Sequence, residues 1–204
     1  MSKKHLFAIV LLLSATFAAP RAIADVSERS ADVQDRGGTT QGDTNEEATR
    51  RLLAQFLAAQ LSLSQAIAIA EGLHRGSRTV AIDFEMSSSP GYRVTTAKNG
   101  EIWENFIDAN TGSVKGAEIA SSLRDLEADD RVNIIALNSV RQELSDAVRV
   151  AERAASGKAV GGSLMKQDGK LNFVVVIVSG DSLKEVMLEP PRVDRQGLAA
   201  RRSR

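Results

Sequence analysis

The chain has 204 residues, with 26 Lys and Arg against 26 Asp and Glu, no cysteine and two histidines. The lack of cysteine excludes thiol catalysis, disulfide frameworks and cysteine-rich zinc sites. Hydrophobic residues make up 43% of the chain and charged residues 25%, a balance typical of globular proteins rather than of disordered or multi-span membrane proteins.

Residues 1–24 have the features of an export signal. Two lysines precede the apolar run 6–13, and an Ala-Ile-Ala sequence ends the segment at Ala24. The apolar run is well short of the roughly 20 residues that a membrane-spanning helix needs. We therefore expect cleavage after Ala24 and a mature protein without a membrane span, either periplasmic or secreted.

The two ends of the mature chain are polar. Residues 25–47 are acidic and rich in Gly and Thr, so we expect a disordered leader. Residues 191–204 carry five arginines and are expected to be a disordered basic tail. Without the signal, 23 basic and 26 acidic residues give a net charge of −3, which argues against nucleic acid as a partner.

An internal repeat lies between these ends. When the chain is laid over itself at an offset of 81 residues, without gaps, apolar and turn positions coincide while surface positions differ. The simplest cause is one small fold built twice, and we place the two copies at residues 48–118 and 119–190. Identical pairs include Leu63/Leu144, Ala66/Ala147, Ala70/Ala151, Glu71/Glu152, Gly76/Gly157 and Val94/Val175.

Each copy predicts one helix followed by three antiparallel strands. Apolar residues recur at helical spacing, a glycine follows, and the period then changes to two. We expect an α+β fold of two tandem units, each a helix packed on its own three-stranded antiparallel sheet. Ser62 and Gln65 form a capping box at the first helix, whereas the second helix is expected to run on from Val140.

The strand 173–178 is apolar on both faces. One face of an antiparallel sheet normally meets water, so a cover for the second face is expected. The first copy or the segment that links the copies could supply it. Alternatively, a second chain pairs through Phe173 to Val178, and the protein is a homodimer.

Three segments of the first copy carry a family resemblance. They are the helix sequence 63–71, the strand start Tyr92-Arg93-Val94 and the closing sequence 107–114, Ile-Asp-Ala-Asn-Thr-Gly-Ser-Val. Together they resemble the PepSY domain, and the second copy resembles it in a degenerate form that lacks the Asp-x-x-Thr-Gly turn. The resemblance implies an exported bacterial module of the kind found in propeptides of thermolysin-like metallopeptidases. Such modules are regarded as non-enzymatic and are proposed to bind or inhibit peptidases.

The sequence offers no convincing catalytic or metal centre, and no cofactor is expected. Asp108, Thr111 and Gly112 fit a structural turn, since the positions that a calcium loop would need next are glycine and isoleucine. His74 is the only histidine after the signal and is expected at a helix end. Glu104 and Glu185 occupy the same repeat position, so acid-base work by the pair is disfavoured because they should lie in separate sheets.

We therefore expect an exported protein- or peptide-binding module that is not an enzyme and that modulates a peptidase. Aromatic side chains dominate contact energy, so Tyr92, Trp103 and Phe173 are the candidate contact residues, with core packing as their alternative role. The competing hypotheses are a self-associating structural protein of the envelope and a hydrolase that acts through carboxylates.

Overall fold

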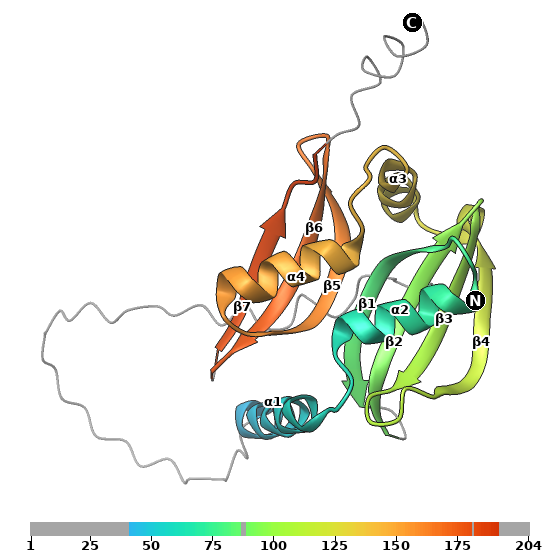
Figure 1. Ribbon diagram of the computed structural model, residues 1–204. Helices are drawn as coiled ribbons and strands as arrows, with labels where there is room; N and C mark the ends of the chain where they lie inside the picture. Colours follow the sequence, from blue (N-terminus) through green and yellow to red (C-terminus); the bar gives the residue numbers. More distant parts are fainter. Residues whose placement is uncertain (1–40, 87–88, 181, 192–204) are drawn as a thin grey trace, which may run out of the picture.

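The computed structural model describes residues 41–86, 89–180 and 182–191 (Figure 1). The expected export signal and nearly all of the basic tail lie outside these residues. Helix α1 spans Gln41–Ala58, so the part of the expected disordered leader that is described is helical instead. Acidic residues are favourable in the first turns of a helix, and Glu47 forms an ion pair with Arg51 one turn later, at 2.7 Å.

Four α-helices and seven strands are found in the described part of the chain. The α+β class and the packing of helices on antiparallel strands are confirmed. The elements after α1 are α2 (Leu63–Leu73), β1 (Arg78–Met86), β2 (Pro90–Lys98), β3 (Glu101–Asp108), β4 (Val114–Ser122), a 3-10 turn (Leu123–Asp125), α3 (Ala128–Leu137), α4 (Leu144–Ala155), β5 (Lys158–Gln167), β6 (Lys170–Ser179) and β7 (Ser182–Leu188).

All seven strands belong to one sheet, in the order β4-β3-β2-β1-β5-β6-β7. The expectation of two separate sheets is therefore wrong. The first strands of the two units pair with each other, Ala81–Asp83 against Gly161–Ser163, and so join the units edge to edge. The first unit also has a fourth strand, β4, which means that the expected boundary at Glu118 falls inside a strand.

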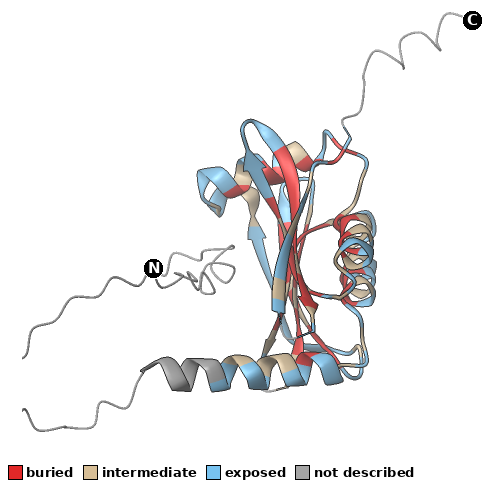
Figure 2. Ribbon diagram, turned by 90° about the vertical axis from the view of Figure 1, so that its left-hand side faces the viewer, coloured by how far each residue is buried: buried red, intermediate tan, exposed pale blue. Residues whose placement is uncertain are grey.

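The helices lie on different sides of this sheet. Helices α2 and α4 lie side by side and antiparallel on one face (Figure 1). In the view from the side, α3 stands on the opposite face and α1 crosses beneath the strands (Figure 2). No single helix in the described ranges is long and apolar enough to span a membrane, although Glu47–Ala58 and Leu63–Leu73 meet that test as a pair bent by 75°.

Strand β6 contains the expected two-faced apolar segment. Phe173, Val175 and Ile177 belong to the core beneath α4. The strand pairs with β5 along one edge and with β7 along the other. Because both edges of β6 are paired within the chain, the strand has no free edge for a second chain in this structure, and a homodimer through Phe173 to Val178 stays a prediction.

The repeat is not free of gaps. The main-chain N–H of Thr79 donates to Glu71 at 2.9 Å, and that of Ala159 donates to the equivalent Glu152 at 3.0 Å. Thr79 and Ala159 each stand directly before a β-bulge. They are therefore equivalent, although they lie 80 rather than 81 residues apart, because the connection after Gly157 is one residue shorter than that after Gly76.

Arg78, at the start of β1, connects the first unit to the approach to the second. Its guanidinium donates to the carbonyl oxygens of Leu137 at 2.5 Å, Val140 at 3.2 Å and Gln142 at 2.8 Å. The same group donates to the carboxylate of Glu143 at 2.7 Å. The carbonyls of Val140 and Gln142 point at Arg78 and are not available to a helix, which explains why α4 begins at Leu144 and not at Val140.

We predict that Arg78→Met lowers the free energy of unfolding by about 3 kcal/mol, because it leaves three carbonyls and one carboxylate without their shared donor. Urea unfolding monitored by circular dichroism measures the change. Arg75→Met, at an exposed position of the same connection, is the matched control and should cost less than about 0.5 kcal/mol. Equal stability of the two variants would contradict the proposed role of Arg78.

Candidate functional site

The three expected contact residues have different surroundings. Phe173 is fully buried in the core and offers no surface to a partner. Tyr92 is also buried, and its ring packs edge-on against Phe84 with centroids 5.4 Å apart. Trp103 is half-buried and stacks on His74 at a centroid distance of 4.0 Å. The structure does not bring the three residues together, and Tyr92 borders a pocket.

The turn after β3 is organised by Asp108. One carboxylate oxygen accepts the main-chain N–H groups of Asn110 and Thr111 at 3.0 and 2.9 Å and the hydroxyl of Thr111 at 3.1 Å. The other oxygen accepts the hydroxyl of Ser89 at 3.1 Å. The hydrogen bonds from Thr111 and Asn110 hold the pKa of Asp108 below its usual value. Gly112 has a φ of 71°, as such a turn requires.

The other acid-base candidates are held in structural contacts or lie apart. His74 bonds Glu118 on β4 at 2.8 Å. Glu104 forms an ion pair with Arg93 at 2.6 Å. Glu185 lies on β7, five strand spacings from Glu104 within the single sheet, or roughly 24 Å. Among the described residues, no group of three or more His, Asp or Glu side chains could hold a metal ion.

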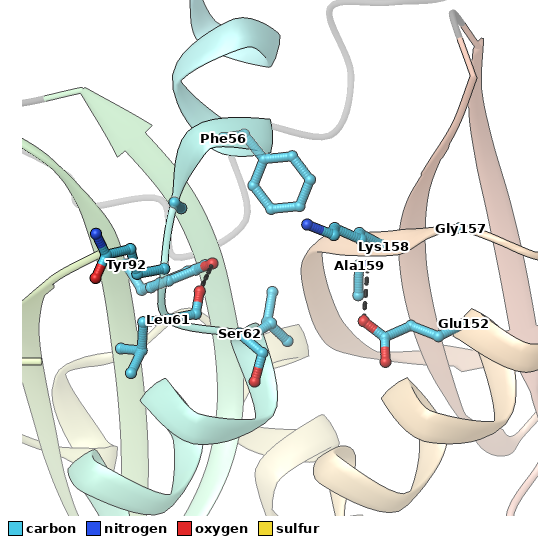
Figure 3. Close-up of a pocket in the computed structure, with 11 residues that line it drawn as sticks. Phe56, Leu61, Ser62, Tyr92, Glu152, Gly157, Lys158 and Ala159 are labelled. Carbon is cyan, nitrogen blue, oxygen red and sulfur yellow. Dashed lines mark hydrogen bonds between the residues drawn. The ribbon is translucent and has the colours of Figure 1, made fainter. Parts of the chain in front are cut away.

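A pocket of about 290 Å³ lies where the two units meet (Figure 3). One wall is the connection between α1 and α2, the opposite wall is the turn from α4 into β5, and Tyr92 of β2 contributes from the sheet. Most of the lining is apolar, with polar groups from a few positions. The lining residues are Phe56, Ala59, Gln60, Leu61, Ser62, Leu63, Tyr92, Glu152, Gly157, Lys158 and Ala159.

Hydrogen bonds fix the walls of the pocket. The Tyr92 hydroxyl donates to the carbonyl of Leu61 at 2.7 Å, while the N–H of Leu61 donates to the carbonyl of Ala109 at 2.8 Å. On the other side, Glu152 accepts the N–H of Ala159 (Figure 3). Burial and, to a lesser extent, the negative charge of Glu152 raise the pKa of Tyr92 to about 12. The pocket is therefore preformed rather than a gap between mobile side chains.

The first unit has larger groups at the equivalent place. Arg78 precedes Thr79 as Lys158 precedes Ala159, so Arg78 and Lys158 are equivalent. Arg78 reaches the segment before α4, whose N-cap is Glu143. Lys158 lies beside the segment before α2, whose N-cap is the shorter Ser62. No hydrogen bond or ion pair of Lys158 is found within the described ranges, and its side chain is exposed.

The strand edges beside the pocket are incompletely paired. The ladder between β1 and β5 covers three residue pairs, from Ala81 to Asp83 on β1. Beyond this ladder, at the C-terminal end of β1, residues 84–86 pair with β2 on one side and have no strand partner on the β5 side. Unpaired edges are templates for an added strand. The end of β1 that pairs with Tyr92 and its neighbours thus has one edge without a strand partner among the described residues.

Sequence reasoning identified Tyr92 but not the residues that face it across the pocket. Glu152 and Lys158 belong to the second unit, and nothing local in their sequence places them next to the segment 59–62. A signal was nevertheless present in the repeat, since the first unit has Arg and Thr where the second has Lys and Ala. Smaller side chains with fewer hydrogen-bond donors, at equivalent positions of one copy, indicate a cavity in that copy.

We predict that Tyr92, the single tyrosine of the chain, ionises at about pH 12 in the folded protein. Glu152→Gln should lower this pKa but leave it above 10, because burial is the larger cause. Ultraviolet absorbance titration measures the value, with Glu101→Gln at the exposed start of β3 as control. The unfolded chain loses its phenolic proton first, so stability should fall as the pH rises from 10 to 12. An unchanged titration in Glu152→Gln would contradict the geometry.

Comparison with known proteins finds a family model that matches part of the first unit. Residues 60–118 match the model of the PepSY family, the "Peptidase propeptide and YPEB domain". The structure is also similar to the crystal structure of a "putative lipoprotein" from Clostridium difficile 630, with 18% identity over 65% of this chain and 88% of that chain and a TM-score of 0.39. No curated protein matches the chain. The matched region runs from just before α2 to the middle of β4 and contains the helix, strand and turn motifs that resemble this family.

Proposed function

We propose that the protein is an exported, non-enzymatic module that binds a protein or peptide partner of the cell envelope and modulates a peptidase. The observation that carries this proposal is the pocket between the units, together with the unpaired edge of β1 beside it. An extended peptide can pair its main chain with such an edge while one side chain enters the pocket.

Two further observations support the parts of this proposal that concern export and the peptidase. The family that matches residues 60–118 carries peptidase propeptides in its description. The features of residues 1–24 are those of an export signal. The second unit, with α4 on β5–β7, is proposed to be a divergent copy of the same domain, because Glu152 and Ala159 repeat the contact between Glu71 and Thr79.

A binding role also agrees with the contacts of the titratable side chains. His74 is engaged by Glu118 and lies against Trp103, so both contacts hold its ring in a structural role. Acid-base work by Glu104 and Glu185 would require the two carboxylates to flank one substrate bond, within about 10 Å of each other. Their places on β3 and β7 do not permit this.

Self-association is less well supported than binding of a peptide. Strand β6 is interior, so a second copy would have to use an edge strand. If β7 paired with its own copy over its full length, Ser182–Leu188, Glu185 at the centre would stand opposite its counterpart. Like charges directly opposite each other destabilise a strand pair.

The binding role is tested with an immobilised array of short extended peptides. We expect the bound peptides to be enriched in large apolar residues. Ala59→Trp, which places an indole in the pocket, should weaken binding about tenfold or more, whereas Ala58→Trp, at the exposed neighbouring position outside the pocket, should bind as the parent does. Binding that is absent, or that is equal in the two variants, would overturn the proposal.

The peptidase role is tested separately. Adding the mature protein to a thermolysin-like metallopeptidase should lower the initial rate of peptide hydrolysis in a dose-dependent way, because a bound module obstructs the substrate cleft. The Ala59→Trp variant should inhibit less than the Ala58→Trp variant. Unchanged rates at saturating protein would remove this peptidase class from the proposal and leave the peptide-binding role to the array.

A further inference from the structure

We infer that the pocket between the units recognises the carboxyl-terminal residue of a peptide, a large apolar residue whose α-carboxylate pairs with Lys158. This inference rests on the proposed peptide-binding function and specifies the ligand of the same pocket. Three features of the pocket carry it: its size, the unpaired ammonium of Lys158 and the spare acceptor capacity of Glu152.

The size of the pocket fits a single residue. Its volume of about 290 Å³ lies at the lower limit of pockets for drug-sized ligands, roughly 300–1,000 Å³. The apolar lining from Phe56, Leu61, Leu63 and Tyr92 suits an aliphatic or aromatic side chain. A charged group that pairs with Lys158 must therefore belong to the same residue that fills the pocket, and a terminal residue carries such a group on its own α-carbon.

Lys158 supplies a cation that the fold does not use. Its amine points across the pocket towards the ring of Phe56 (Figure 3), and no partner for it is found in the described parts of the chain. The guanidinium of the equivalent Arg78, by contrast, is hydrogen-bonded to three carbonyls and to the carboxylate of Glu143. An unpaired ammonium beside an apolar pocket favours an anionic group at the rim, and a carboxylate is the anion that peptides provide.

Glu152 can accept the N–H of the same ligand residue. The equivalent Glu71 accepts both the N–H and the hydroxyl of Thr79, each at 2.9 Å. Glu152 accepts the N–H of Ala159 at 3.0 Å, and the methyl group of Ala159 offers no second donor. A carboxylate has about four acceptor positions. The main-chain N–H, the apolar side chain and the α-carboxylate of one terminal residue thus each meet a matching group.

The test compares acetyl-Ala-Ala-Leu with its carboxyl-terminal amide by isothermal titration calorimetry on the mature protein. The free carboxylate should bind about fivefold or more tightly than the amide at low salt, and the advantage should shrink as salt screens the pair. In Lys158→Gln the two peptides should bind equally, because the acid loses its advantage over the amide. Lys166→Gln, an exposed lysine on the same strand, should keep the parent's preference.

Other outcomes separate the failure of this inference from failure of the proposed function. Equal binding of acid and amide by the parent overturns the inference and leaves peptide binding in place. Binding of neither peptide, together with an array without ligands, overturns both. Free leucine that binds as tightly as acetyl-Ala-Ala-Leu also overturns the inference, because the ligand is then an amino acid and not the end of a peptide.

Discussion

The bonds of one guanidinium set the relation between the two units. Arg78 begins β1, and its donors reach the last carbonyl of α3 and two carbonyls in the segment that follows. Since the carbonyls of Val140 and Gln142 are held outside any helix, α4 begins at Leu144, with Glu143 as its N-cap. The start of α4 in turn fixes where β5 meets β1. A seven-stranded sheet thus depends on a side chain at the first residue of its central strand.

The sequence predicted those parts of the fold that have local causes. The capping box of Ser62 and Gln65 is present at the start of α2, and the class of the fold is as expected. The single sheet could not be predicted, because the pairing of β1 with β5 joins residues about 80 positions apart. Strand β4 was also missed, since an exposed edge strand of small and charged residues shows no apolar alternation.

The candidate site was harder to predict for a related reason. Choosing contact residues by aromatic type selected Tyr92, Trp103 and Phe173, although a buried aromatic residue usually serves the core. The pocket is built from connections, and its walls come from residues 56–63 and 152–159. Its cause in the sequence is a series of small changes between the repeats, in which Arg78, Thr79 and Ser62 of the first copy correspond to Lys158, Ala159 and Glu143 of the second.

The stack of Trp103 on His74 has a spectroscopic consequence. Trp103 is the only tryptophan of the chain, and the only tyrosine, Tyr92, belongs to the same unit. Intrinsic fluorescence therefore reports on the environment of the first unit, while α4 and β5–β7 emit almost nothing of their own. Circular dichroism, by contrast, sees the backbone of both units. If the two unfolding curves coincide, the two units unfold as one cooperative structure. If the curves separate, their separation measures how weakly the three-pair ladder between β1 and β5 couples the units.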